Sequence, residues 1–281
     1  MKLEIAICQL IPRIGDSEIN AKTVIRTIED GDQDVSVFPE MFLSGYGSSP
    51  PDDCERLLGT ISDACRSCGK AAAVGAAMTG ENGKRNVLAF LSPDGDVLYD
   101  KIHLARFGLY SEEGYVAGNG PAIGRYKGIG FGLSVCYDAF FPEVMHCCAL
   151  DGAEIMVCAS ASAIPSLRYF RRVLPARALE NVSYLVYVNN TGTLSGLEMG
   201  GGSSAYDPLG NTLIELGREE SVARIVFDTD TIAEARAERH HIEDFRKDIA
   251  WPLRHPTRRS SVSFIKGKLF PELGSRDGPA R

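Results

Sequence analysis

Three side chains with complementary chemistry follow predicted strands of this sequence. Glu40 follows an apolar run at residues 35–38, and Lys101 and Cys136 each follow a similar run. Strand ends on one edge of a sheet are common places for catalytic residues, because the scaffold is stiff while the loops are open to substrate. A thiolate can attack a carbonyl carbon, a carboxylate can carry the proton, and an ammonium can neutralise the oxyanion. The three residue types together therefore indicate nucleophilic catalysis by a cysteine.

Cys136 is predicted to lie where a strand gives way to a helix. Phe131, Leu133 and Val135 alternate with the two-residue period of a strand, whereas the residues beyond Asp138 take on helical spacing. Such a junction can direct main-chain N–H groups and a helix N-terminus at the side chain, which favours a thiolate and stabilises an oxyanion. The alternative is a structural cysteine, since free cysteine is among the most buried residue types.

Strands and helices alternate early in the chain, and strands predominate later. Strands are expected at residues 3–10, 35–38, 71–77, 86–92, 97–101, 122–126, 129–135, 154–159, 184–189, 203–206, 211–216 and 222–227. Helices are expected from Asp16 or Ser17 to Gly31, at residues 56–69 and 166–181, and after Thr231. Pro175 should kink the third helix or mark its first turn. This order suggests an α/β (α+β) fold in which sheets pack together with helices outside.

Length and composition predict one domain with a C-terminal extension. The chain has 281 residues, 44% of them hydrophobic, and a net charge of -7. No linker interrupts the pattern, so we expect one domain over residues 1–250 and a surface or subunit-contact arm over residues 251–281. The acidic charge gives no sign of a nucleic-acid partner, and no stretch approaches the ~20 apolar residues of a membrane span.

The eight cysteines predict a reducing compartment. They lack the spacing of a disulfide framework, and the first residues resemble a strand and not a signal peptide, so we expect a cytoplasmic protein. Cys65 and Cys68 form a C-x-x-C pair, but no second pair follows at zinc-finger distance. We therefore expect no metal site there.

Three motifs resemble those of the nitrilase, or carbon–nitrogen hydrolase, superfamily. They are FPEMFLSGY at residues 38–46, YDKIHL at residues 99–104 and VCYDAFFPE at residues 135–143. Shorter matches occur at residues 151–154, 177–181, 189–190 and 202–204. The resemblance extends from the first strand to about residue 248. It implies a four-layer-type α-β-β-α sandwich, a homodimer or higher homo-oligomer, and a reaction that needs no cofactor.

The resemblance also implies a role for each residue of the set. Glu40 would be general base and then general acid, and Cys136 would be the nucleophile. Lys101 would stabilise the oxyanion, helped by the backbone N–H of Tyr137. Ammonia or an amine would leave from a thioester acyl-enzyme, which water then hydrolyses.

A second glutamate often lies between the lysine and the cysteine of such proteins, where it positions lysine and substrate. Glu112 is the favoured candidate because it follows a segment like those of the amidase branches, and Glu113 is the alternative. The chain departs from the family pattern at His146, where many relatives carry arginine, and at Gly114, which replaces a basic residue.

The substrate is expected to be a small carboxylic amide or an N-carbamoyl compound. True nitrilases tend to carry Trp-Glu where this chain has Tyr137 and Asp138. Loops at residues 46–54 and 160–167 are expected to line the pocket. The candidate substrate-binding residues are Tyr46, Tyr137, Ala161 and Ser162.

Three other functions remain open from the sequence: a nitrile hydrolase, a catalytically silent binding protein on the same fold, and a Cys–His acyltransferase or peptidase that uses His103. An intact Glu40, Lys101 and Cys136 argue against a silent scaffold, which needs none of them. A histidine beside a hydrophobic run is more often a hydrogen-bonded packing residue than a catalytic base.

Two further segments allow a structural and a functional interpretation. Arg168, Arg171 and Arg172 are either a solvated helix face or contacts for an anionic substrate. Residues 200–202 are three glycines that could suggest a phosphate cradle, but they lack the lysine of a P-loop. We expect this segment to be a flexible entry to a strand.

Overall fold

Two six-stranded sheets form the centre of the computed structural model, which describes residues 1–106 and 111–246. The first sheet contains, in spatial order, β14 (Ser221–Asp228), β1 (Lys2–Gln9), β2 (Val35–Val37), β3 (Ala71–Gly80), β4 (Gly83–Leu91) and β5 (Val97–Asp100). The second contains β13 (Thr212–Glu215), β12 (Ser204–Tyr206), β9 (Tyr184–Asn189), β8 (Ile155–Ser160), β7 (Ile129–Val135) and β6 (Ala122–Tyr126).

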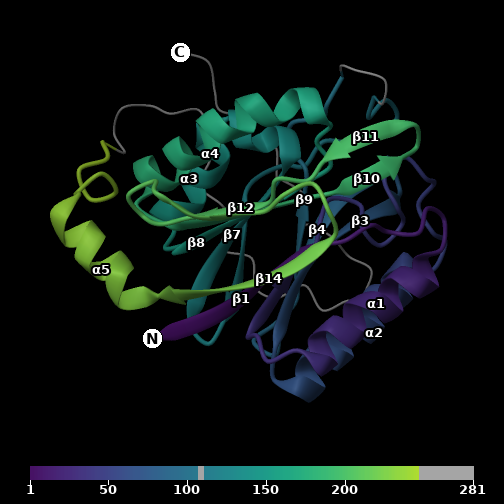
Figure 1. The fold of residues 1–281 in the computed structure, drawn as a ribbon, viewed down its shortest axis with the longest axis horizontal. Coiled ribbons are helices and arrows are strands. Elements are labelled where there is room, and N and C mark those ends of the chain that lie inside the picture. Colours follow the sequence, from purple (N-terminus) through teal and green to yellow (C-terminus); the bar gives the residue numbers. More distant parts are fainter. Residues whose placement is uncertain (107–110, 247–281) are drawn as a thin grey trace, which may run out of the picture.

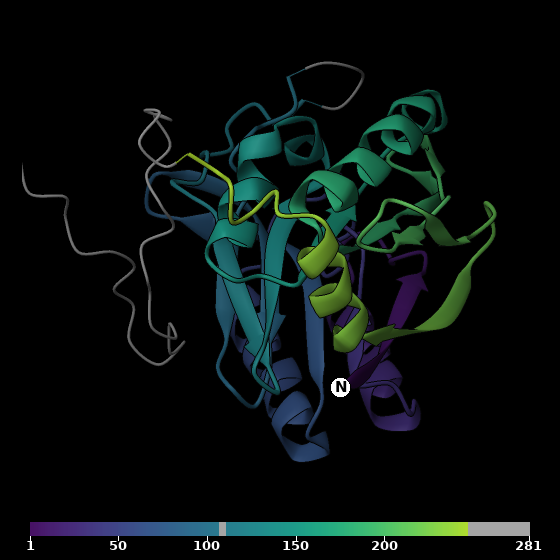
Figure 2. The same cartoon turned by 90° about the vertical axis from the view of Figure 1, so that its left-hand side faces the viewer.

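Helices cover the outer face of each sheet. The first sheet carries α1 (Ser17–Asp30) and α2 (Cys54–Cys68), and the second carries α3 (Pro142–Leu150) and α4 (Leu167–Asn181) (Figure 1). Figure 2 shows the two helix pairs on opposite sides of the sheets. The last helix, α5 (Thr229–Glu238), contacts the loops that follow α3 and α4, where Arg236 donates to the carbonyls of Ala153 and Val182. Each helix buries one apolar stripe, as Val24 and Ile28 do on α1. The predicted α-β-β-α sandwich is confirmed.

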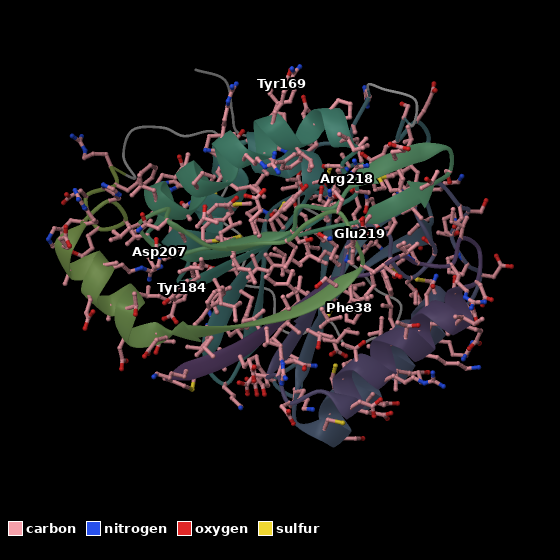
Figure 3. All side chains as sticks on the ribbon, in the orientation of Figure 1. Phe38, Tyr169, Tyr184, Asp207, Arg218 and Glu219 are labelled. Carbon is pink, nitrogen blue, oxygen red and sulfur yellow. The ribbon has the colours of Figure 1, made fainter. Side chains whose placement is uncertain are left out.

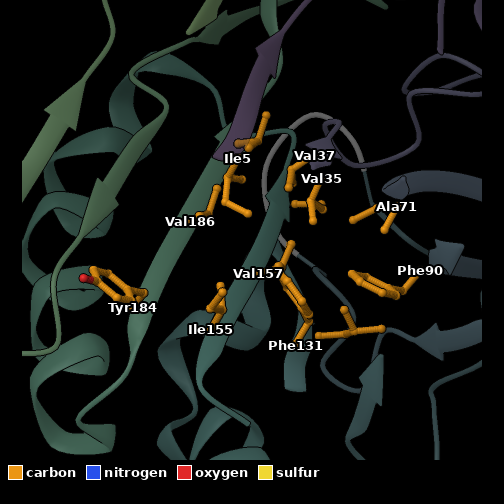
Figure 4. Packing of buried hydrophobic residues seen from close by; sticks show 14 of the residues in the cluster. Ile5, Val35, Val37, Ala71, Phe90, Phe131, Ile155, Val157, Tyr184 and Val186 are labelled. Atoms are coloured by element: carbon orange, nitrogen blue, oxygen red, sulfur yellow. The ribbon is translucent and has the colours of Figure 1, made fainter. Parts of the chain in front are cut away.

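The main core lies between the two sheets. Figure 4 shows Ile5, Val35, Val37, Ala71 and Phe90 of the first sheet facing Phe131, Ile155, Val157, Tyr184 and Val186 of the second. The rings of Phe90 and Phe131 meet across the interface with centroids 4.9 Å apart. Because the alternate residues of the same strands pack against the helices, these strands are apolar on both faces, which explains their nearly continuous hydrophobic sequence.

Most of the expected elements are present, and local signals account for their ends. Asp16 caps α1 by accepting a hydrogen bond from the backbone N–H of Ile19 at 3.1 Å. Gly69 ends α2 with a φ of 64°, the left-handed conformation for which glycine is suited. Pro175 lies inside α4, so it does not mark a first turn.

One hairpin was not predicted from the sequence. Strands β10 (Thr191–Leu194) and β11 (Leu197–Gly200) pair through a two-residue turn at Ser195 and Gly196, both with positive φ. Gly200 therefore ends a strand, and only residues 201 and 202 lead into β12 as the expected connection.

The domain boundary predicted near residue 250 lies outside the described residues, as does the arm at residues 251–281. Within the part of the chain that the structure describes, no helix combines the length and apolar character needed to cross a membrane.

Candidate active site

The candidate catalytic residues lie at one edge of the sandwich. Strands β1, β2 and β3 are parallel in one sheet, and β7, β8 and β9 are parallel in the other. Glu40 follows β2 and Cys136 follows β7, whereas Lys101 follows β5, which runs in the same direction as β3 because both are antiparallel to β4. The N–H of Glu40 bonds to the carbonyl of Ser160 at 3.3 Å, so the strand ends of the two sheets meet.

A buried network of charges joins Glu40, Lys101 and Glu112. The Nζ atom of Lys101 lies 2.8 Å from Oε1 of Glu40 and 2.8 Å from Oε2 of Glu112. The Nδ2 atom of Asn86 donates to Oε1 of each carboxylate, at 2.7 Å for Glu40 and 2.6 Å for Glu112. Glu113 is exposed, so the structure places Glu112 and not Glu113 beside the lysine.

The electrostatics of this network keep the lysine charged. Burial opposes its charge, but the negative charges of Glu40 and Glu112 and the hydrogen bond to Glu112 outweigh that effect, and the pKa of Lys101 lies well above its usual range. Burial raises the pKa of Glu40, while the charge of Lys101 opposes the rise and that of Glu112 adds to it. Lys101 is therefore a fixed ammonium, and Glu40 is a carboxylate that gains a proton more easily than an ordinary glutamate.

The two oxygens of Glu40 have different environments. Its Oε1 accepts from both Lys101 and Asn86, whereas its Oε2 is buried and has no hydrogen-bond partner among the described residues. A buried acceptor without a partner is costly and rare in folded proteins. Oε2 is thus the atom of this carboxyl group that can accept a proton from a reacting group.

Cys136 begins a 3-10 helix, Cys136–Phe140, that leads into α3, as the predicted strand-to-helix junction requires. Its φ is 47°, a left-handed conformation that costs about 1–2 kcal/mol for a residue with a Cβ atom. Asp138 fixes the turn, because its Oδ2 accepts from the N–H of Val135 at 3.1 Å and from the hydroxyl of Tyr99 at 2.7 Å.

The thiol of Cys136 is protonated at neutral pH. Burial and the negative charge of Glu40 raise its pKa to about 11, against the smaller opposing effects of Lys101, Ser160 and Ser162. The sequence-based expectation that the junction favours a thiolate is therefore wrong for the resting protein. The causes are burial of the sulfur and, second, the charge of Glu40, neither of which a single strand-to-helix pattern reveals.

The four candidate substrate-binding residues lie in different surroundings. Tyr46 and Ala161 are buried in an apolar cluster with Met41, Leu194 and Met199. Burial raises the pKa of Tyr46, and the charge of Glu40 adds to the effect, which places its hydroxyl within electrostatic reach of that carboxylate. Tyr137 is partly exposed, with its ring 5.0 Å from that of Phe141, and Oγ of Ser162 lies 3.5 Å from Sγ of Cys136.

His103 is a packing residue in this structure. Its Nδ1 atom and its backbone N–H both bond to Oδ1 of Asp138, at 3.0 and 2.8 Å. Its ring stacks on Phe141 with centroids 3.6 Å apart. These contacts agree with the hydrogen-bonded packing interpretation and not with a Cys–His base.

The remaining candidates lie away from the charged network. Cys65 is buried and Cys68 is exposed on α2. In residues 1–106 and 111–246, no group of three or more His, Cys, Asp or Glu side chains is arranged to hold a metal ion. Cys68 is the one exposed cysteine, whereas Cys136 is half-buried and the other six are buried.

A cavity of about 400 Å³ beside the start of α4 is lined by Arg168, Arg171 and Arg218, but by none of the catalytic candidates. Figure 3 labels Tyr169 and Arg218 on this side of the molecule. Arg168 bonds to the hydroxyl of Tyr169 at 2.7 Å, and Arg171 bonds to Glu215 at 2.7 Å. These exposed, internally bonded side chains fit the solvated-surface interpretation of the arginines.

Three residues that support the site were not identified as functional from the sequence. Asn86 bridges the two glutamates, and Nδ2 of Asn190 donates to the carbonyl of Glu40 at 2.9 Å. Gly75 lies beneath the Glu40 loop, where a Cβ atom would be 2.2 Å from the carbonyl oxygen of Pro39. A polar Asn at the start of an apolar strand and a glycine in the middle of one were the available signals.

Gly75→Ala should displace Glu40, because the added methyl group would also lie 2.7 Å from Cα of Glu40 and backbone atoms cannot move aside cheaply. We expect a loss of about 1–3 kcal/mol in the free energy of unfolding, together with a fall in kcat. Gly59→Ala on α2 is the control: nothing lies within 4 Å of the new Cβ atom, so it should be neutral or stabilising. Thermal unfolding and steady-state kinetics of both variants test this, and a fully active Gly75→Ala protein would contradict it.

The sequence profile of the Carbon-nitrogen hydrolase family matches residues 4–237, so the protein belongs to this family. The chain is 32% identical to an (R)-stereoselective amidase from Pseudomonas sp, over 88% of this chain and 92% of that protein. It is 28% identical to a 2-oxoglutaramate amidase from Bacillus subtilis strain 168, over 89% of this chain and all of that protein (100%).

The fold is also that of known members. A crystal structure of a CN-hydrolase superfamily protein from Xanthomonas campestris, with an arsenic adduct in its active site, matches with a TM-score of 0.79. That protein is 25% identical, and the match covers 88% of this chain and 98% of the other. Together these similarities identify an amidase-like carbon–nitrogen hydrolase.

Proposed function

We propose that this protein hydrolyses the C–N bond of a small carboxylic amide, or of an N-carbamoyl compound, through an acyl-enzyme at Cys136. One observation carries the proposal. A protonated thiol lies within the field of a buried carboxylate, one oxygen of which is held by Lys101 while Oε2 has no partner among the described residues. The amidase relatives support an amide as the substrate.

In the first half of the reaction, Oε2 of Glu40 takes the thiol proton as the sulfur of Cys136 attacks the carbonyl carbon. Negative charge moves to the carbonyl oxygen. An ammonium has three N–H donors, so Lys101 can keep its two carboxylate partners and still donate to this oxygen, with the N–H of Tyr137 as a second donor. Glu40 returns its proton to the leaving nitrogen when the C–N bond breaks, which leaves a thioester.

In the second half, Glu40 acts as base again. It takes a proton from water, the water oxygen attacks the thioester carbon, and the C–S bond breaks as the proton passes back to the sulfur. The acid product leaves and the thiol of Cys136 is restored. Glu112 holds Lys101 in place throughout, since its Oε2 accepts from the lysine and from the N–H of Ala105 at 2.5 Å.

The acyl group would be bordered by the residues nearest the sulfur. We assign this role to Tyr46, Tyr137, Ala161 and Ser162, of which Tyr46 and Ala161 belong to a buried apolar cluster. A homodimer or higher homo-oligomer and a cytoplasmic location stay predictions from the sequence.

Intact-protein mass spectrometry tests the proposal directly. Wild-type protein and Glu40→Gln are exposed to amides, N-carbamoyl amino acids and nitriles, in a Cys68→Ser background that removes the exposed thiol. We expect a mass gain equal to the acyl group, mapped to Cys136. In Glu40→Gln the gain should form slowly, because acylation also needs the base, and should then persist longest, because thioester hydrolysis needs it as well.

Cys136→Ala is the control and should show no gain with any compound. An adduct formed only from nitriles would identify a nitrile hydrolase instead. No adduct on Cys136 across the panel, together with a slow reaction of this cysteine with thiol reagents, would contradict the proposal and favour the silent binding protein.

A further inference from the structure

Three buried hydroxyl groups form a chain that ends on the sulfur of Cys136. The hydroxyl of Tyr187 donates to Oγ of Ser160 at 3.3 Å, Oγ of Ser160 lies 2.7 Å from Oγ of Ser162, and Oγ of Ser162 lies 3.5 Å from Sγ of Cys136. Tyr187 and Ser160 come from the neighbouring strands β9 and β8, and Ser162 follows β8. The mechanism above uses none of these three hydroxyl groups.

The hydrogen bonds of this hydroxyl chain can run in only one direction once the sulfur is ionised. Each hydroxyl carries a single hydrogen, and a thiolate can only accept. Tyr187 donates to Ser160, so Ser160 is free to donate to Ser162, and Ser162 to the sulfur. Successive hydroxyl groups polarise one another when they are aligned in this way, and burial strengthens each bond because water does not compete.

Ser162 is held where a donor to the sulfur is needed. The Oδ1 atom of Asn189 accepts from the N–H of Ser162 at 2.7 Å, and its Nδ2 atom donates to the carbonyl of Ser162 at 3.0 Å. The backbone of Asn189 is in turn fixed by Oγ of Ser203 at 2.9 Å. A donor fixed by its surroundings stabilises a developing charge without reorganisation during the reaction.

We infer that Ser162 is a catalytic residue that stabilises the thiolate of Cys136 as the last donor of the chain, with Ser160 and Tyr187 as positioning residues behind it. The inference deepens the proposed function and rests on it in one respect, that Cys136 is the nucleophile. Proton removal remains the task of Glu40. The hydroxyl chain takes no proton and lowers the cost of forming the charged sulfur beside a carboxylate.

The charges around the sulfur make such a donor useful. Lys101 and the nearby hydroxyl groups of Ser160 and Ser162 oppose the effects of burial and of Glu40, which raise the pKa of the thiol. Titratable groups that interact electrostatically with Cys136 are Glu40, Tyr46, Lys101, Cys158 and Tyr187. Lys101 is already paired with two carboxylates, so it compensates only part of the new negative charge.

The rate of alkylation of Cys136 by iodoacetamide between pH 6 and 10 tests the inference without any substrate. All variants are made in a Cys68→Ser background, and modification is mapped by mass spectrometry. Ser162→Ala removes a hydrogen bond to a charged group. Cys136 of this variant should therefore be alkylated about 10-fold more slowly at neutral pH, and its plot of alkylation rate against pH should move about one pH unit upward. Ser160→Ala and Tyr187→Phe should give smaller shifts in the same direction.

Ser134→Ala is the matched control. Ser134 is a buried serine on β7. Its hydroxyl donates to the carbonyl of Val157 at 2.9 Å and not to any of the three chain hydroxyls, so the alkylation profile should not change. Thermal unfolding of each variant checks that it is folded. If Ser162→Ala does not fold, Ser160→Ala interrupts the same chain one position further from the sulfur.

A double-mutant cycle decides whether the chain acts as a unit. The effect of Tyr187→Phe should vanish when Ser162→Ala or Ser160→Ala is already present, because the connection to the sulfur is then broken. An equal effect of Tyr187→Phe in both backgrounds, or an alkylation profile of Ser162→Ala like that of its parent, would overturn the inference. If the alkylation profiles shift as expected but no amide forms an acyl-enzyme in the mass-spectrometry experiment, the result counts against the proposed function and not against this inference.

Discussion

Replacing Lys101 with methionine should abolish turnover and lower the free energy of unfolding at neutral pH by about 3–5 kcal/mol. Methionine fills much of the same volume but leaves the carboxylates of Glu40 and Glu112 buried without a counter-charge. Turnover is lost because the same ammonium is the proposed donor to the oxyanion. Chemical denaturation and steady-state assays measure the two effects separately.

The stability deficit of Lys101→Met should shrink as the pH falls. Burial already raises the pKa of Glu40, and the lysine charge opposes that rise, so removing the lysine raises this pKa further. A carboxyl group with a raised pKa in the folded state favours folding at low pH, and this stability is lost as the pH rises through that pKa. The deficit should therefore be smaller near pH 5 than near pH 8.

Lys127→Met is the control for Lys101→Met. Lys127 lies 2.6 Å from Asp34 in an exposed ion pair, for which about 0–1 kcal/mol is expected. Equal losses of stability in the two variants would show that the buried network does not depend on the charge of Lys101.

Glu40→Gln should lower kcat by about 10³-fold and leave thermal stability nearly unchanged. A glutamine can keep an oxygen at the position of Oε1, where Lys101 and Asn86 donate, and places its amide nitrogen where Oε2 was. The substitution thus preserves the contacts and removes only the proton acceptor. It also removes a buried carboxylate, which offsets any loss of packing.

Glu112→Gln is the matched variant, and its thermal stability, unlike that of Glu40→Gln, should fall. Both oxygens of Glu112 accept hydrogen bonds, from Asn86, Lys101 and the N–H of Ala105, so an amide nitrogen here faces a donor. We expect a clear fall in melting temperature for Glu112→Gln. If Glu40→Gln loses as much stability as Glu112→Gln while keeping its kcat, the assignment of Glu40 as base is wrong.

The acid side of the pH profile provides a second check on Glu40. A general base must be ionised, and burial raises the pKa of Glu40 above that of an ordinary glutamate, which is about 4.3. Wild-type kcat/KM should therefore fall with decreasing pH through a value above 4.3, and the decrease should be absent from the residual activity of Glu40→Gln.

The layers and the strand ends could be predicted from the sequence because both depend on local patterns. Strands apolar on both faces and helices with one apolar stripe imply sheets that are covered on the outside. The family resemblance supplied the choice of Glu40, since the tripeptide Phe-Pro-Glu occurs twice more in the chain. The β10–β11 hairpin was missed although Ser195 and Gly196 are a turn signal, because its strands are short and rich in glycine.

Contacts between residues far apart in the chain could not be predicted. Asn86 and Asn190 act on Glu40 from 46 and 150 residues away, and no periodicity encodes such a pairing. The protonation state of Cys136 was predicted wrongly for the same reason, since burial of the thiol and the charge of Glu40, which follows a strand of the other sheet, together raise its pKa. The hydroxyl chain behind Ser162 depends on two residues from two strands, Ser160 and Tyr187, which only their alignment in space reveals.

The left-handed backbone at Cys136 sets the stability of the fold against the chemistry of the site. With a φ of 47°, this position would be more stable by about 1–2 kcal/mol with glycine than with a residue that has a side chain. Cys136→Gly is therefore expected to be at least as stable as the wild-type protein, although it has no nucleophile. Stability and chemistry favour different residues at this one position.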